Sequence, residues 1–323
     1  MKPVDPIELK PDKASVPEPL SLPPAKRKKR RSSLWPSAPT LLVLSLAALA
    51  VSLKPLYSPQ RPVLCYPQAQ VQGGTLEFRV NAAIRPERLS CEFSGEHYAF
   101  FRAADGGLRA LVPVQLFARP VLHYAVVREK NFFGQRVLAR IPVAIKRGNY
   151  QRIKLTLHTK ATQSKADREM FLVSARQMLL QTLAGQDPAQ YWRGHFIFPL
   201  RGRTSAPYGE RRTVNGRSGG VHYGVDIAAP AGTEVVAANT GLVALTGNFP
   251  LQGKIVLLNH GQGVFTAYLH MNEIVAQEGT VIKQGQLLGR TGSTGRSTGP
   301  HLHWGAYLHG IPVNPLEWLD REL

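Results

Sequence analysis

Short strand-like runs separated by glycines fill the chain from residue 196 to its end, and no long helical period interrupts them. Apolar and polar residues follow the pattern of half-buried strands, and glycines stand where tight turns need them. This pattern predicts a compact antiparallel β domain over residues 196–323. Strands are expected at residues 233–238, 241–245, 253–258, 264–270 and 285–289.

This predicted domain carries four histidines and one aspartate in three motifs: His222, Asp226, His270, His301 and His303. His301 and His303 are two residues apart, so an extended strand presents both on one face, about 6–7 Å apart. His222 and Asp226 would be about 13 Å apart on an extended strand, and Gly224 between them permits a bend. Imidazole nitrogens and a carboxylate oxygen suit zinc, and three ligands leave a position open for water. The pattern therefore predicts a hydrolytic zinc site, in preference to a set of structural histidines.

The chain is strongly basic, with 40 Lys and Arg against 21 Asp and Glu and a net charge of +19. Six of these charges lie in the run 26–31, and the rest are scattered without a basic helix or an aromatic platform. A basic surface of this kind suits an anionic envelope polymer or a membrane surface at least as well as nucleic acid. We expect an anionic envelope polymer and the cytoplasmic membrane as partners and no nucleic acid, while protein partners leave no signal.

An apolar stretch near the amino terminus predicts a membrane segment. Residues 1–33 are rich in proline and polar residues and end in the basic run, which predicts a disordered basic cytoplasmic tail. Residues 34–54 have no charge before Lys54 and are long enough to span a bilayer, as a transmembrane signal anchor. The alternative is a cleaved signal peptide, since Ala48-Leu49-Ala50 resembles a cleavage site. The anchor places the rest of the chain on the periplasmic or extracellular side of a bacterial cytoplasmic membrane, as a single-pass protein.

Residues 62–148 contain short alternating runs with turn signals between them, which predicts a small β-sandwich-like accessory domain. Asp105-Gly106-Gly107 is a hairpin signal, and Tyr98 to Arg102 is one of the expected strands. Cys65 and Cys91 both lie in this segment. In an oxidising compartment they would form a disulfide, and the alternative is a pair of buried thiols.

Residues 149–195 are expected to form a linker with a helix. Ser164 and Asp167 have the spacing of a capping box, and Gly185 can end the helix. Apolar residues repeat between them at helical spacing: Phe171, Ala175, Met178, Leu179 and Leu183. The chain is thus predicted to be mainly β, with an N-terminal transmembrane helix, a β-sandwich-like domain, a short helical linker and a C-terminal antiparallel β domain.

Four segments of the last domain carry a resemblance: Ser205–Arg212, His222-Tyr-Gly-Val-Asp226, Tyr268-Leu-His270 and the block from Thr291 to His303, which ends in Gly299-Pro-His301-Leu-His303. They resemble the lead-in, the first zinc motif, the central Tyr-x-His segment and the closing block of the lysostaphin/LytM-type zinc metallopeptidases, the M23 family of cell-wall endopeptidases. The resemblance covers about residues 205–318. One departure is Gly216, where some members have a tyrosine.

The resemblance implies that His222, Asp226 and His303 hold one zinc ion and that His270 and His301 are catalytic. It also implies hydrolysis of peptide bonds in peptidoglycan stem peptides or cross-bridges. A different outcome is a wall-binding scaffold or amidase activator of the same fold, although such members typically lack one or more of these five residues. A glycan hydrolase with paired carboxylates finds little support, because few acids lie near the motifs.

The remaining polar candidates of this domain are expected to have other roles. His260 and His309 stand at turns and are expected to be structural. Arg211, Arg212 and Arg296 are candidates for binding a substrate carboxylate, with solvated surface arginines as the alternative.

Overall fold

In the computed structural model, the described residues are 63–155, 181–185, 187–214, 216–321 and 323. Their regular structure is almost entirely β-strand, which confirms the mainly β prediction. The predicted tail (1–33), the membrane segment (34–54) and the start of the predicted helix lie outside these residues. Across the described ranges, no helix is long and apolar enough to cross a membrane.

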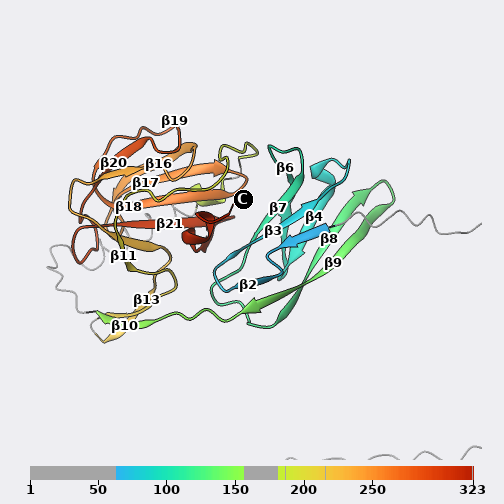
Figure 1. The fold of residues 1–323 in the computed structure, drawn as a ribbon, viewed down its shortest axis with the longest axis horizontal. Helices are drawn as coiled ribbons and strands as arrows, with labels where there is room; N and C mark the ends of the chain where they lie inside the picture. The colour runs from blue at the N-terminus through green and yellow to red at the C-terminus, as the bar shows by residue number, and fades with distance from the viewer. Residues whose placement is uncertain (1–62, 156–180, 186, 215, 322) are drawn as a thin grey trace, which may run out of the picture. The chain divides into compact units, whose positions relative to one another are not determined.

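The N-terminal strands form two sheets (Figure 1). In spatial order, the first sheet contains β1 (Val63–Tyr66), β3 (Thr75–Val80), β7 (Leu108–Pro113) and β6 (Phe101–Arg102). The second contains β2 (Ala69–Val71), β9 (Gly134–Lys146), β8 (Leu122–Asn131), β4 (Leu89–Phe93) and β5 (Glu96–Ala99), and a short 3₁₀ helix η1 (Pro86–Arg88) precedes β4. Side chains of both sheets share one buried cluster, which includes Phe78, Cys91 and Val127. The arrangement is a β-sandwich, as the alternating runs predict.

The segment from Tyr98 to Arg102 is not the single strand that its composition predicts. It contributes its first part to β5 and its last part to β6, which belong to different sheets. Phe100 and Phe101 are buried in succession, so the alternation breaks where the chain passes between the sheets. The hairpin signal is confirmed, since β6 pairs with β7 across it and Asp105 Oδ1 accepts from Gly107 N at 2.9 Å.

The two cysteines are free and buried, on β1 of one sheet and β4 of the other. Burial raises the pKa of the Cys65 thiol to about 12 and raises that of Cys91 as well. The structure therefore shows the thiol alternative, in which both residues act as small apolar core side chains.

The linker contains a strand that its sequence does not predict. Strand β10 (Arg152–Leu155) pairs in parallel with β12 (Arg211–Val214), which forms a three-stranded sheet with β13 (Arg217–Val221). Four alternating residues carry too little signal to predict a strand whose partner lies about sixty residues further on. The described residues 181–184 are helical and are followed by Gly185, in agreement with the predicted end of the helix.

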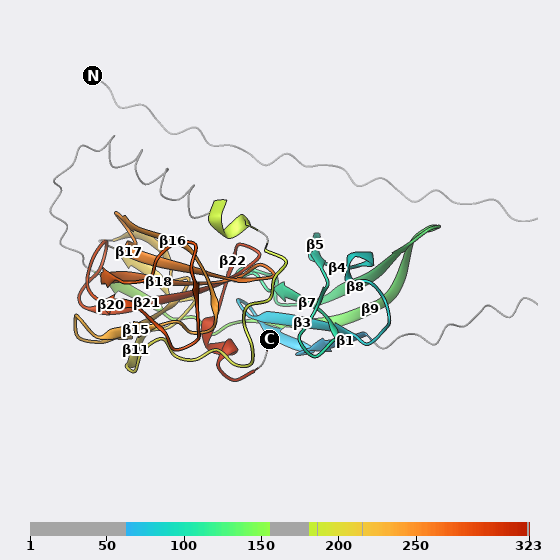
Figure 2. The ribbon, with the colours of Figure 1, turned by 90° about the horizontal axis from the view of Figure 1, so that it is seen from above.

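A ten-stranded antiparallel sheet forms most of the C-terminal part, as the sequence predicts (Figures 1 and 2). Its main path is β11 (Arg203–Ala206), β14 (Val225–Ala228), β21 (His301–Leu308), β18 (Val264–Ile274), β17 (Gly253–Gly261), β16 (Gly241–Phe249) and β19 (Val281–Ile282). Strand β20 (Leu287–Thr291) pairs with both β15 (Glu234–Val236) and β18, and β22 (Ile311–Val313) pairs with β21. The five predicted strands coincide with β15, β16, β17, β18 and β20, and β16 to β18 run further than predicted. A 3₁₀ helix, η2 (Pro315–Trp318), follows β22.

The core of this C-terminal part also takes in side chains from the sandwich. Phe101 and Leu111 belong to the same buried cluster as Trp192 and Trp318. Trp318 is fully buried, lies 5.0 Å from the Phe196 ring between centroids, and donates from Nε1 to Thr75 Oγ1 at 3.2 Å. The short helix η2 thus contributes to both packing and hydrogen bonding between the two β regions.

Replacement of Trp318 by alanine is expected to destabilise the protein by about 3–5 kcal/mol, because it removes a fully buried indole and leaves a cavity. Trp318→Phe keeps most of the ring volume and loses the bond to Thr75, so a loss of about 1–2 kcal/mol is expected. Urea unfolding followed by far-ultraviolet circular dichroism measures both changes. Equal stabilities for the alanine variant and the wild type would contradict this role of η2.

Candidate metal centre and catalytic histidines

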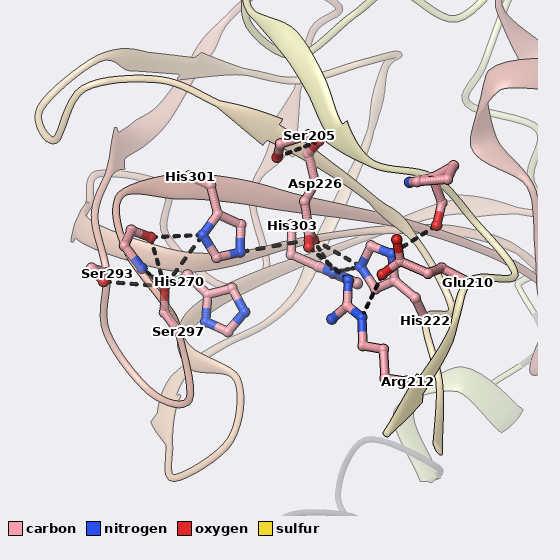
Figure 3. A network of polar contacts seen from close by, with 12 residues as sticks. Ser205, Glu210, Arg212, His222, Asp226, His270, Ser293, Ser297, His301 and His303 are labelled. Atoms are coloured by element: carbon pink, nitrogen blue, oxygen red, sulfur yellow. Dashed lines mark hydrogen bonds and ion pairs between the residues drawn. The ribbon is translucent and has the colours of Figure 1, made fainter. Parts of the chain in front are cut away.

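The pairing of β14 with β21 brings together two residues that are far apart in sequence. In this antiparallel ladder Asp226 lies directly opposite His303, and opposite residues project from the same face of a sheet. His222 lies just before β14 and is fixed by two backbone bonds, from its N–H to Glu210 O and from Gly209 N–H to its carbonyl. The two strands and this short connection place three ligand atoms at one point (Figure 3).

Gly224 has a different role from the bend that the sequence predicts. The φ of Gly224 is not positive, and a Cβ at this position would lie 2.5 Å from His303 Nε2. Glycine is therefore needed because the backbone passes close to a ligand side chain.

Three ligand atoms converge at nearly equal distances. His222 Nε2 is 2.8 Å from Asp226 Oδ1 and 2.8 Å from His303 Nδ1, and His303 Nδ1 is 2.9 Å from Asp226 Oδ1. All three residues could contribute one atom each to a single metal ion. The structure thus brings the three predicted ligands together.

The proton inventory of this triangle favours a cation. His222 Nδ1 lies 2.9 Å from the Pro207 carbonyl, which can only accept, so Nδ1 donates there. In the neutral imidazole Nε2 then carries a lone pair, and it faces the acceptor Oδ1 of Asp226 at 2.8 Å. Two lone pairs in contact repel unless a proton or a metal ion lies between them. Two imidazoles and a carboxylate form a ligand set that fits zinc.

Electrostatics keep these groups in the forms that bind metal. Burial opposes ionisation of Asp226, but its contacts with His222 and His303 outweigh burial and hold its pKa below the usual value. Burial lowers the pKa of His303, although Asp226 opposes this effect. Both shifts favour metal binding, which requires a charged carboxylate and an unprotonated ligand nitrogen.

A β-bulge directs His270 toward this centre. The pairing of β17 with β18 shifts register between Lys254/Met271 and Val256/Tyr268, and His270 in this interval has φ of +63°. Such a backbone is rare for residues other than glycine and is a form of local strain. Bulges re-aim side chains next to active sites, and here the bulge brings the His270 ring within 4.8 Å of the His301 ring and 6.1 Å of the His303 ring, between centroids.

Carbonyl groups set the tautomers of His270 and His301. His270 Nδ1 lies 2.8 Å from Thr294 O, and His301 Nδ1 lies 2.8 Å from Gly299 O. Carbonyls only accept, so each Nδ1 donates and each neutral ring keeps its lone pair on Nε2. His301 Nε2 lies 3.8 Å from Asp226 Oδ1. Burial, followed by the nearby His303, lowers the pKa of His270 to about 4, so this ring is a neutral imidazole at pH 7.

The five predicted site residues line one cavity of about 600 Å³. Polar and apolar side chains both line this cavity, among them Glu210 and Leu269. Ile153 of β10 also lines it, so the linker strand contributes to a wall of the site. A chamber of this size accommodates a short peptide segment beside the metal ligands.

Arg212 contacts a metal ligand, where the sequence suggests a partner for a substrate carboxylate. Its Nη2 donates to Asp226 Oδ2 at 3.1 Å and its Nε donates to Glu210 Oε1 at 2.9 Å. Asp226 therefore directs Oδ1 at the ligand triangle while Arg212 holds Oδ2. Glu210 and Arg212 are two apart, a spacing that places them on one face of a strand, but only the tertiary structure shows Asp226 as their partner.

The other sequence candidates lie elsewhere. His260 is fully buried between Thr240 O and Thr266 Oγ1, and His309 contacts the carbonyl of Leu111 at the turn after β21, so both are structural as expected. Arg211 lies over the Phe117 ring at 5.6 Å. Arg296 lines the cavity and remains available for a substrate.

Comparisons with known proteins agree with this geometry. Residues 220–315 match the model of Peptidase family M23. These residues form a peptidase family M23 domain. The resemblance in the sequence motifs is thereby confirmed.

Two curated relatives are similar over this domain. Peptidoglycan DD-endopeptidase ShyA of Vibrio cholerae is 42% identical over 96 residues, which is 30% of this chain and 22% of that protein. DD-carboxypeptidase/endopeptidase Mpg of Neisseria meningitidis is 42% identical over 114 residues, 35% of this chain and 26% of that protein. The chain thus spans about a quarter of the length of these relatives.

A solved structure extends the likeness beyond the M23 domain. The putative peptidase M23 from Pseudomonas aeruginosa superposes with a TM-score of 0.59 and 24% identity, covering 77% of this chain and 94% of that one. At this identity the likeness establishes the fold. Because the superposition covers 77% of this chain, the shared fold extends beyond the M23 domain.

Replacement of Arg212 by methionine is expected to weaken zinc binding about 10- to 100-fold, because groups that orient a metal ligand contribute on this scale. Competition with a chromophoric chelator measures the affinity. The direction of the change in zinc affinity separates two roles of Arg212. If Arg212 acted only as a positive charge near the site, its loss would strengthen the binding of a cation. Arg212→Lys should be intermediate because it keeps one donor, and Arg211→Met should have no effect.

Proposed function

We propose that the chain is a membrane-anchored zinc metalloendopeptidase that hydrolyses peptide bonds in peptidoglycan stem peptides or cross-bridges. The observation that carries the proposal is the convergence of His222, Asp226 and His303 on one point, beside two imidazoles with free Nε2 atoms. The peptidoglycan endopeptidases similar to the M23 domain support the substrate class.

Zinc in this site would supply Lewis acidity toward the scissile carbonyl and toward a water molecule, whose pKa it lowers to about 7. His222, Asp226 and His303 would hold it. Arg212 would keep the Asp226 carboxylate in place, and Glu210 would keep Arg212 in place. These residues bind and orient, and they do not exchange protons during turnover.

His270 and His301 would carry the proton transfers. Each donates through Nδ1 to a fixed carbonyl, so each presents Nε2 as the atom that accepts a proton from water or donates one to the leaving amine. Burial keeps His270 neutral at pH 7, so its Nε2 lone pair is available at that pH. An imidazolium formed on either ring also stabilises negative charge that develops on the carbonyl oxygen.

The membrane anchor rests on the amino-terminal sequence. The basic run 26–31 precedes an uncharged apolar stretch at 34–53, which favours an orientation with the basic side in the cytoplasm. The catalytic domain would then lie outside the cytoplasmic membrane, on the side where peptidoglycan is found.

Substitution of three site histidines is expected to separate metal binding from turnover. His222→Ala should lose both zinc and activity, since it removes a ligand. His270→Ala and His301→Ala should retain zinc and lose about 10²–10⁴-fold in rate, the usual contribution of a general acid or base. Zinc content by atomic emission and release of muropeptides by chromatography measure the two properties.

The matched control is His309→Ala, which removes a histidine outside the site and should leave both properties in place. Loss of zinc from the His270 or His301 variant would overturn the division of roles. Release of muropeptides that persists after complete removal of metal would overturn the metallopeptidase itself.

A further inference from the structure

The turn between β8 and β9 exposes two phenylalanines. Asn131 and Gly134 form the last pair of the ladder, so Phe132 and Phe133 make up the two-residue loop. Phe132 is 96% exposed and Phe133 is 95% exposed, and their rings meet edge to face with centroids 5.5 Å apart. Loops of this length favour asparagine, aspartate and glycine. The geometry of the turn therefore does not account for a pair of aromatic side chains.

This tip projects from the sandwich. β8 has 10 residues and β9 has 13, whereas β4 has 5, and β4 pairs with β8 only as far as Leu89 opposite Glu129. In both ribbon views the β8–β9 turn extends past the ends of the neighbouring strands (Figures 1 and 2). Two projecting rings can insert into a surface that deforms around them, such as a lipid bilayer. They form no groove that could receive a partner.

Basic residues flank the tip in sequence, although Arg128 pairs with Glu92. Residues 128–140 contain Arg128, Lys130, Arg136 and Arg140 and a single acid, Glu129. Glu129 is buried and already pairs with Arg136 at 3.0 Å and with Arg88 at 3.5 Å. The Lys130 ammonium is exposed and has no ion pair within the part of the chain that the structure describes. The base of the hairpin tip is therefore positive.

We propose that the Phe132–Phe133 tip inserts into the interface of a bilayer that exposes anionic phospholipid headgroups. The two rings enter the boundary between headgroups and acyl chains, where apolar side chains gain from burial. Lys130 and Arg136 then lie at the level of the phosphates. A basic residue near such a surface strengthens binding about five-fold.

The membrane anchor of the proposed function would keep this hairpin near a membrane, and this part of the argument rests on that anchor. Only eight residues, Pro55 to Pro62, separate the predicted membrane segment from β1, and they reach at most about 30 Å when fully extended. A chain anchored by that segment keeps the sandwich within reach of the same bilayer. A protein partner would have to supply a pocket for two aromatic rings with acidic residues around it. The described residues give no indication of such a partner.

An environment-sensitive dye at the tip tests the insertion in the full-length chain. Phe133→Cys carries the dye, and Ser94→Cys, in the β4–β5 turn at the other end of the same sheet, is the matched control. The native thiols are buried, so the unsubstituted chain should take up little dye. Each labelled protein is reconstituted in vesicles of phosphatidylethanolamine with phosphatidylglycerol, and separately in vesicles of phosphatidylcholine alone.

On the anionic vesicles the dye at 133 should brighten several-fold and be quenched by spin-labelled lipid, while the dye at 94 stays in water. Lys130→Glu should weaken this response, so that more phosphatidylglycerol is needed to reach it. A dye at 133 that stays as exposed as the dye at 94 on anionic vesicles overturns the proposal. So does a change at 133 that requires no lipid, which would indicate contact between protein molecules.

Discussion

The antiparallel pairing of β14 with β21 is the interaction on which the metal site depends. Its register sets Asp226 opposite His303, so the carboxylate and the imidazole leave the same face of the sheet at adjacent positions. A shift by one residue would turn one of them to the other face and abolish the triangle of ligand atoms. Buried apolar neighbours on the same strands, Ile227 and Leu302, fix that register because they must stay in the core.

Around this ladder, the backbone itself does much of the positioning. Carbonyls of Pro207, Thr294 and Gly299 accept from the Nδ1 atoms of three histidines and so decide which nitrogen of each ring faces the cavity. A bulge with a left-handed residue turns His270 inward. These contacts are made by loops and strand irregularities, which are held in place by the packed sheet behind them. The chemistry thus depends on main-chain atoms as much as on the histidines.

The rest of the chain is connected to the site more closely than a tethered accessory module would be. The linker strand β10 pairs with β12, which carries Arg212, and places Ile153 in the wall of the cavity. Phe101 and Leu111 of the sandwich share a buried cluster with Trp318 of the C-terminal part. Movement of the linker strand would therefore act on residues that line the site, whereas the sandwich packs against the core behind it.

The sequence by itself determined the mainly β class and five strands of the C-terminal sheet, and it predicted the five candidate residues of the site, because periodicity and motif spacing are local properties. It did not determine the strand β10, the break at Phe100, the role of Gly224 or the contact of Arg212 with Asp226. Each of these depends on a neighbour that is distant in the chain, and that neighbour exists only once the sheets have formed. The tertiary structure decided them because register and close packing are set by the whole core.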